Sequence, residues 1–228
     1  MTPVNLASLS LVGTLILAPA GRRAAGPVSG RIIVMDKGDK VAPDVGQAVV
    51  WLERASGPTP APRSIHAVVT AENKTFTPHV AVVPAGSSIT FPNRDGFDHN
   101  VFSLSEAGPF DLGLYERGDG KTVTFPTAGI IRVYCNIPST MSAIIVVAGS
   151  PWYTQPEGDG SYSIPAVPPG SYVLHAWHER ANVEVSVPVT VTATGAQVPD
   201  VMLDARGFRP ESHMNKFGKP YARVGRRY

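Results

Sequence analysis

The sequence predicts an all-β protein, and three observations support that prediction. Gly and Pro number 22 each among 228 residues, which favours short strands joined by many turns. Val, Ile, Thr and Tyr recur in short alternating runs, the pattern of strands with one buried face. After residue 20 no segment keeps a helix-period apolar face for more than two turns. Apolar residues make up 43% of the chain, enough to bury a core in one large or two small domains.

An apolar stretch near the start predicts an export signal over residues 1–20. It runs from Leu6 to Leu17, and Ala18-Pro19-Ala20 follows it in the small-x-small pattern of a cleavage site. The preceding segment has no Lys or Arg, and the alternative is a buried N-terminal strand. The apolar run is too short for a transmembrane helix. We therefore expect a periplasmic or secreted protein.

Two strands and a proline-rich linker are expected next. Gly30–Val34 and Ala48–Leu52 alternate as strands do, with a polar loop over residues 36–46 between them. Residues 55–63 contain three prolines, so this segment cannot be a central strand and is expected to be a linker.

A run of short strands is expected between residues 65 and 148. Turn residues at 85–86 and 128–129 separate some of them, and strands at this spacing are typical of a sandwich or barrel. The expected strands cover residues 66–70, 80–83, 88–91, 100–103, 121–125, 130–134 and 143–147. Further strands are expected at residues 161–164, 172–178, 183–191 and 198–203. Beyond residue 205 the apolar pattern ends.

The single cysteine, Cys135, lies in a motif that indicates metal chemistry. An exported chain with one cysteine forms no internal disulfide, so this thiol pairs between chains, stays buried and inert, or binds a metal. A blue-copper centre needs one thiolate, two imidazoles and a weak thioether. His99 opens an expected strand, and Met141 follows Cys135 within one tight loop. Sulfur and imidazole ligands suit copper.

Five short motifs in this region resemble those of the plastocyanin-like cupredoxins. They are Phe76-x-Pro78, Val82-Val83-x-x-Gly86, Phe91-x-Asn93-x-Asp95, His99-Asn100-Val101-Phe102-Ser103 and Cys135-x-x-Pro138-x-x-Met141. The chain also resembles bacterial proteins labelled methylamine-utilisation-like, over roughly residues 28–203. The resemblance implies a cupredoxin-like Greek-key sandwich over residues 64–149 and one copper ion bound by His99, Cys135 and Met141. It also implies electron transfer or copper handling, with a redox partner protein or a larger periplasmic complex.

The motif departs from that family at Pro138, where the family's loop reads Cys-Asn-Ile-His. Proline has no side-chain donor, so this loop alone supplies no second imidazole. Three interpretations stay open. Another histidine substitutes, with His79 the nearest candidate; copper binds weakly through the three remaining residues and water; or the site has lapsed. In the last case the protein is a metal-free structural or carbohydrate-binding β-protein.

The segment from Asp159 to Leu174 reads Asp-Gly-Ser-Tyr-x-Ile-Pro-x-Val-Pro-Pro-Gly-Ser-Tyr-x-Leu. This motif is similar to the carboxypeptidase regulatory-like domain, a small transthyretin-type β-sandwich with a structural or adhesive role. The early strands of that domain match Gly30–Val34 and Gln47–Leu52. We therefore expect a discontinuous sandwich over residues 27–57 and 150–205, with the cupredoxin-like unit inserted. The alternative is a tandem arrangement, and contact between strands 30–34 and 198–203 would favour insertion.

Two histidines and several aromatic residues offer weaker candidates. His175 and His178 lie three residues apart on an expected strand, so their rings point to opposite faces and do not chelate together. One of them is an alternative donor to the copper site across a domain contact. The carbohydrate-binding alternative would use as stacking surfaces Trp152, Tyr153 and Trp177.

Charge and motifs exclude several classes of function. The net charge of +2 is too small to indicate nucleic-acid binding. The chain has no Gly-x-Ser-x-Gly elbow, HExxH zinc motif or phosphate-binding glycine loop, so we expect no enzyme and no catalytic residues. Residues 206–228 form a basic tail that we expect to be disordered. Its alternative role is a weak contact with a membrane surface or an acidic partner.

Overall fold

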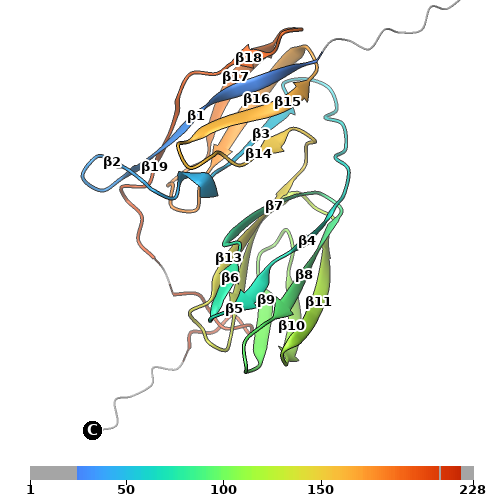
Figure 1. The fold of residues 1–228 in the computed structure, drawn as a ribbon, viewed down its shortest axis with the longest axis vertical. Coiled ribbons are helices and arrows are strands. Elements are labelled where there is room, and N and C mark those ends of the chain that lie inside the picture. The colour runs from blue at the N-terminus through green and yellow to red at the C-terminus, as the bar shows by residue number, and fades with distance from the viewer. Residues whose placement is uncertain (1–24, 211, 222–228) are drawn as a thin grey trace, which may run out of the picture.

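The computed structural model describes residues 25–210 and 212–221, which fold into two β-sandwiches (Figure 1). The all-β prediction is confirmed: the one helical element among the described residues is a short 3-10 helix, Val45–Gln47. None of these residues belongs to a helix that is long and apolar enough to cross a membrane. The export signal expected over residues 1–20 lies outside the described residues.

The first sandwich is built from segments near both ends of the described chain. In one of its layers β1 pairs antiparallel with β15 and parallel with β18 and β19. The strands of this layer are β1 (Gly26–Asp36), β2 (Lys40–Val41), β15 (Ser161–Val167), β18 (Ala196–Gln197) and β19 (Val201–Asp204). The opposite layer has the order β14-β3-β16-β17. Its strands are β3 (Val49–Arg54), β14 (Tyr153–Thr154), β16 (Gly170–Trp177) and β17 (Val185–Val191).

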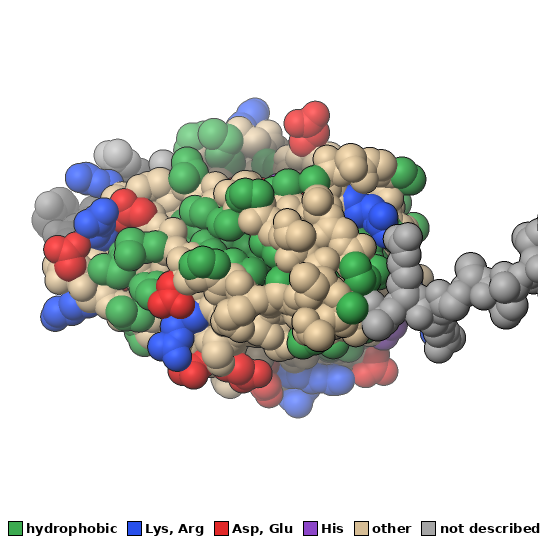
Figure 2. All heavy atoms as spheres, turned by 90° about the horizontal axis from the view of Figure 1, so that it is seen from above, with side chains coloured by type: hydrophobic (Ala, Val, Ile, Leu, Met, Phe, Trp, Pro, Cys, Tyr) green, Lys and Arg blue, Asp and Glu red, His purple; other side chains and the backbone are tan. Residues whose placement is uncertain are grey.

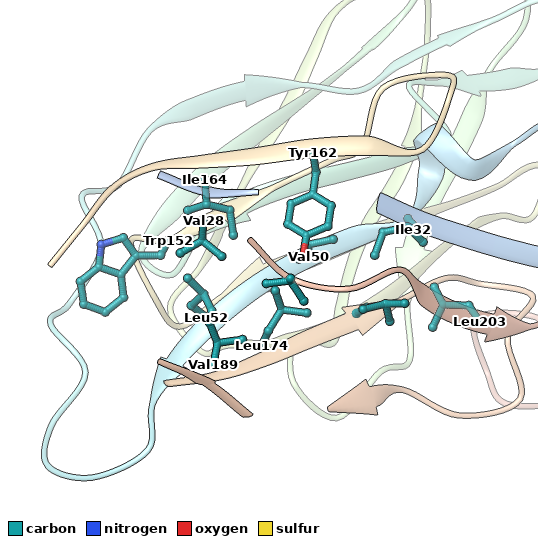
Figure 3. Close-up of a cluster of buried hydrophobic side chains, with 14 of the residues drawn as sticks. Val28, Ile32, Val50, Leu52, Trp152, Tyr162, Ile164, Leu174, Val189 and Leu203 are labelled. Atoms are coloured by element: carbon teal, nitrogen blue, oxygen red, sulfur yellow. The ribbon is translucent and has the colours of Figure 1, made fainter. Parts of the chain in front are cut away.

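The pairing of β1 with β19 links residues far apart in the sequence. Ile32 pairs with Val201 and Val34 pairs with Leu203, and all four side chains are buried. Figure 3 shows the core that these two layers enclose, with Ile32 and Leu203 among its side chains. This is the contact that was expected to favour an inserted second unit over a tandem arrangement.

The second sandwich lies between β3 and β14 in the sequence and also has two layers. One layer has the order β10-β9-β12-β13-β7, and the other has the order β11-β8-β5-β6 with β4 beside β8. Its strands are β4 (His66–Val68), β5 (Thr70–Glu72), β6 (Thr75–Thr77), β7 (Val80–Pro84), β8 (Ser87–Asn93), β9 (His99–Ser103), β10 (Phe110–Tyr115), β11 (Gly118–Phe125), β12 (Gly129–Cys135) and β13 (Ser142–Ala148).

The strands of this sandwich differ from expectation in three places, one of which is the short strand β6, which was not expected. Residues 66–70 were expected to form one strand, but β4 ends at Val68 and β5 begins at Thr70. The sequence pattern does not indicate β10, because its pairing with β9 shifts register between Asp111 and Leu114. That irregularity breaks the alternation of buried and exposed residues on which strand prediction depends.

An apolar layer joins the two sandwiches. Alternation along β13 directs Ile145 into the core of the second sandwich and Ile144 toward the first. Ile144 packs in one cluster with Val146, and with Val49 and Trp177 of the first sandwich. An ion pair between His79 and Glu179 also joins the two sandwiches, with His79 Nε2 2.6 Å from Glu179 Oε2.

A cleft of about 310 Å³ opens beside this layer. Its walls include Trp51 and Glu53 of β3, Glu184, and the start of β12 at Gly129. Cys135 stands at the other end of β12, so this cleft is separate from the candidate metal centre.

The face seen from the side of the first sandwich is apolar in its middle (Figure 2). Lys and Arg side chains alternate with Asp and Glu side chains around the rim of that face. No continuous basic surface is visible there, in keeping with the small net charge of +2.

The described part of the C-terminal tail runs from the first sandwich back to the second (Figure 1). The tail was expected to be disordered, but residues 212–221 are in contact with the second sandwich. Three of their side chains form hydrogen bonds to it. The basic charge of the tail does not predict these contacts, because they are made by His213, Lys216 and Tyr221. Residues 222–228 lie outside the described part.

Candidate metal centre

His99 and Cys135 meet between the two layers of the second sandwich. His99 begins β9 and Cys135 ends β12, and these strands pair through Val101 and Cys135. Alternation along β12 places Ile131, Val133 and Cys135 on the core face. The Cys135 sulfur lies 3.5 Å from His99 Nδ1, and both residues are fully buried.

Met141 closes the loop that begins at Cys135. The Cys135 backbone N–H donates a hydrogen bond to the Met141 carbonyl over 3.2 Å, which fixes both ends of the loop. The Met141 side chain is 1% exposed and belongs to the same apolar cluster as Cys135. The fold therefore brings an imidazole and a thiol into contact, with a thioether in the same buried cluster.

The carbonyl of Ile137 contacts both of the paired side chains. It lies 2.9 Å from the Cys135 sulfur and 2.9 Å from His99 Nδ1. The Ile137 N–H also donates to that sulfur over 3.3 Å. A metal bound between the sulfur and Nδ1 would replace the thiol proton that Cys135 donates to this carbonyl. In the metal-free protein the Ile137 carbonyl thus accepts from the thiol and lies against the imidazole.

Asp95 orients His99 from the opposite side of the ring. Its Oδ2 lies 2.9 Å from His99 Nε2, and the backbone N–H groups of Asn73 and Lys74 donate to its two oxygens over 2.7 and 3.0 Å. Burial raises the pKa of Asp95, but hydrogen bonds from Lys74, His99 and Asn73 outweigh burial and hold that pKa below its ordinary value. A carboxylate that accepts Nε2–H leaves Nδ1 free to present a lone pair toward Cys135.

Burial governs the protonation of the thiol. Removal from water raises the pKa of Cys135, and hydrogen bonds from the backbone of Ile137 and Asn100 only partly oppose that increase. The residue is therefore a protonated thiol in the metal-free protein at neutral pH. A metal must displace that proton in order to bind the thiolate.

The histidines considered as substitutes for the missing imidazole make contacts elsewhere. His79 pairs with Glu179, and its Nδ1 lies 3.1 Å from the Ser142 carbonyl. His178 is buried beside Asp44. The His175 ring is stacked on Trp51, with centroids 5.1 Å apart. Each of these rings thus has a structural role of its own. Pro138 remains without a replacement from this group.

Two of the aromatic residues considered as stacking surfaces are buried. Trp152 is 7% exposed and packs edge-on against Tyr172, with ring centroids 5.2 Å apart. Trp177 is 8% exposed and belongs to the layer between the sandwiches. Neither offers an open face to a sugar ring. Tyr153 is half-buried on β14.

The sequence did not single out three features of this site. Asp95 belongs to a quoted motif and precedes His99 by one turn-like loop, which was the available signal for its role. The Ile137 carbonyl is a backbone group and has no residue-type signal. The C-terminal segment carries His213, whose Nε2–H donates to the Ser139 carbonyl over 2.8 Å. Nothing in the sequence near His213 indicates this contact.

Within residues 25–210 and 212–221, no group of three or more His, Cys, Asp and Glu side chains is arranged to hold a metal ion. The candidate centre differs from such a group because its third residue is a methionine. Its donor chemistry is one imidazole, one thiol and one thioether, which is the kind of set that copper accepts.

Comparisons with known proteins give a partial structural likeness. No family model and no curated protein matches the sequence. A reduced tryptophan-to-tyrosine mutant of amicyanin is 21% identical, with 36% of this chain and 80% of that chain covered and a TM-score of 0.34. The Cu(I) form of a methionine-to-alanine mutant of amicyanin is 19% identical, with coverages of 43% and 99% and a TM-score of 0.35.

A copper-containing nitrite reductase from Thermus scotoductus is also similar, at 23% identity and a TM-score of 0.35. That match covers 42% of this chain and 25% of the reductase. All three likenesses cover less than half of the chain. The function therefore has to be argued from the candidate site itself.

Proposed function

We propose that this protein is an exported copper-binding protein on a cupredoxin-like sandwich. One copper ion binds to His99, Cys135 and Met141, in an altered mononuclear site that lacks the second histidine. The observation that supports this most directly is the 3.5 Å approach of the Cys135 sulfur to His99 Nδ1 inside a buried cluster that also contains Met141. The flanking sandwich, similar to the carboxypeptidase regulatory-like domain, supports the copper-binding unit structurally.

The donor set favours the reduced form of copper. Two sulfur donors and one imidazole are ligands that select Cu(I), and copper would supply one-electron redox chemistry when bound. Cys135 provides the thiolate once its proton is released, and Asp95 keeps the His99 ring oriented. A site with three protein donors is more open than one with four. This suits copper handling or electron transfer to a redox partner or a larger periplasmic complex.

Copper titration of the reduced protein tests this proposal. Cu(I) affinity is measured by competition with a chromophoric chelator, and Cu(II) addition is followed by visible absorption. We expect one copper per chain and a thiolate-to-copper band that disappears in Cys135→Ser. Met141→Leu should weaken Cu(I) binding, whereas the matched control Met202→Leu should not, because Met202 is 57% exposed and lies on β19. A colourless protein that takes up no Cu(I) would refute copper binding.

A metal-free protein is the second candidate, and one observation favours it. The Ile137 carbonyl already accepts a hydrogen bond from the Cys135 thiol, and Asp95 accepts one from His99. A lapsed centre would retain that arrangement as part of the core, since buried polar groups need partners. In that case the chain would be a structural or ligand-binding β-protein, and Cys135→Ser would alter stability without any effect on copper uptake.

A further inference from the structure

A polar network connects the C-terminal segment, residues 212–221, to the candidate metal centre. Asn136 Nδ2 donates to Asn100 Oδ1 over 2.7 Å, and Asn100 Nδ2 donates to Asp111 Oδ1 over 2.6 Å. Lys216 Nζ donates to Asp111 Oδ2 over 2.8 Å. The Tyr221 hydroxyl donates to Asn136 Oδ1 over 2.7 Å. Two side chains of the segment thus bind both ends of one chain of hydrogen bonds.

This network reaches the residues next to two of the proposed ligands. Asn100 follows His99 on β9, and Asn136 follows Cys135 at the end of β12. The Asn136 backbone N–H donates to the Asn100 carbonyl over 3.1 Å, so the two asparagines bridge the two strands. The Tyr221 hydroxyl is also 3.4 Å from the Cys135 carbonyl. A shift of the C-terminal segment would therefore be transmitted to both His99 and Cys135.

A second contact holds the middle of the loop. The His213 ring stacks on Tyr134, with centroids 4.1 Å apart and an interplanar angle of 12°. Tyr221 packs against the same His213 ring edge-on, with centroids 5.3 Å apart. With its ring held in this way, His213 donates through Nε2–H to the Ser139 carbonyl over 2.8 Å. Ser139 lies directly after Pro138, the position that lacks a metal-binding side chain.

These contacts fall where the proposed copper site has no ligand. A copper ion bound to Cys135 and Met141 would fix the two ends of the loop but not residues 136–140. The segment contacts that stretch at Asn136 and at Ser139. We infer that residues 212–221 are a strap that positions the Cys135–Met141 loop, in place of the anchor that a metal-bound side chain at residue 138 would give. This inference rests on the proposed copper binding.

The strap can be loosened without any change to the proposed ligands. The variant Lys216→Met/Tyr221→Phe in the full chain removes the donors to Asp111 and Asn136 and keeps the size of both side chains. Lys219→Met is the matched control, because it removes the same charge from an exposed lysine of the same segment. Hydrogen exchange of the loop amides is measured in the copper-free protein. Copper affinity and the energy of the thiolate-to-copper band are measured after loading.

We expect loop amides in Lys216→Met/Tyr221→Phe to exchange about tenfold faster and copper to bind about tenfold more weakly, since each lost hydrogen bond has a modest net effect. The energy of the thiolate-to-copper band should also shift, while hydrogen exchange in the core of the first sandwich should stay unchanged. In the control variant Lys219→Met, loop exchange, copper affinity and the copper band should all match the wild-type protein. A strap that only stabilised the fold would leave the copper band in place.

Each outcome decides the inference. Unchanged loop exchange together with an unchanged copper band would overturn the strap, while copper binding by the wild-type protein would leave the proposed function standing. If the wild-type protein takes up no copper, the proposed function fails. Loop exchange in the copper-free protein then decides by itself whether residues 212–221 position the loop.

Discussion

The apolar layer between the sandwiches predicts that they unfold as one cooperative unit. Two neighbouring isoleucines on β13 allow a matched test, because Ile144 faces this layer and Ile145 faces the core of the second sandwich. Their exposed fractions are 1% and 0%, so burial is the same at both positions. The variants Ile144→Ala and Ile145→Ala therefore remove the same atoms from two different cores.

The expected loss follows from the atoms removed. Ile→Ala deletes three carbon atoms, which at roughly 0.8 kcal/mol per buried carbon gives about 2.4 kcal/mol. The cavity left behind brings the loss in unfolding free energy to about 3 kcal/mol for either variant. The two variants should differ in which part of the molecule is destabilised. Ile144→Ala weakens the coupling between the sandwiches, and Ile145→Ala weakens only one of them.

Urea unfolding followed by two probes separates these effects. All three tryptophans belong to the first sandwich, and Trp177 also lies in the layer, so their fluorescence reports the first sandwich together with that layer, whereas far-ultraviolet circular dichroism reports both sandwiches. In Ile144→Ala the two transitions should separate. In Ile145→Ala they should remain coincident at lower urea. A loss below about 1 kcal/mol in Ile144→Ala, with coincident transitions, would refute the idea that this layer is a packed core.

Three further predictions concern the site and its surroundings. Pro138→His should tighten copper binding by about tenfold or more, because it restores an imidazole to the loop, and a chelator competition measures the change. Asp95→Asn should weaken copper binding by about tenfold, because it removes the carboxylate that orients His99, measured in the same way. His79→Asn should lower the urea-derived unfolding free energy by about 1 kcal/mol in mildly acidic solution, because it removes the ion pair with Glu179.

The pH range of the last effect follows from the two pKa shifts. A hydrogen bond with Glu179 raises the pKa of His79 above 6.5, so its stabilisation is complete below that pH and is lost as the pH rises through the raised value. The same contact lowers the pKa of Glu179 below 4.5, so its stabilisation is present above that pH and is lost as the pH falls through the lowered value. The difference between wild type and His79→Asn should be largest between pH 4.5 and 6.5.

Controls make these three predictions decisive. An equal effect of His79→Asn at about pH 9 would show that packing, rather than charge, explains it. Unchanged copper affinity in Pro138→His would contradict the alignment of the loop with the cupredoxin motif. Asp95→Asn should leave the copper-free fold intact, as judged by circular dichroism; if copper affinity also stayed the same, Asp95 would have no role in orienting His99.

Much of the fold follows from patterns that are local in the sequence. Period-two alternation along β12 and β13 locates these strands and assigns each side chain to a face. The same alternation places Cys135 toward the core. The motif at Asp159–Leu174 led to the expectation that strands 30–34 and 198–203 belong to one sandwich. The structure contains that contact as the pairing of β1 with β19.

Other features depend on tertiary contacts that no local pattern records. The bulged strand β10 was missed because its register shift disrupts alternation. The contacts of residues 212–221 were missed because a basic segment without apolar periodicity is typical of a solvated tail. The Ile137 carbonyl between Cys135 and His99 is a backbone group, and its position depends on the path of the loop.

X-ray absorption at the copper edge tests the central claim most directly. The protein is loaded with one equivalent of Cu(I), and the atoms around the metal are identified from the extended fine structure. The proposed function predicts two sulfur neighbours, from Cys135 and Met141, and one imidazole nitrogen from His99, with one sulfur lost in Cys135→Ser. A spectrum with only nitrogen and oxygen neighbours, or one that Cys135→Ser leaves unchanged, would contradict a copper centre at this site.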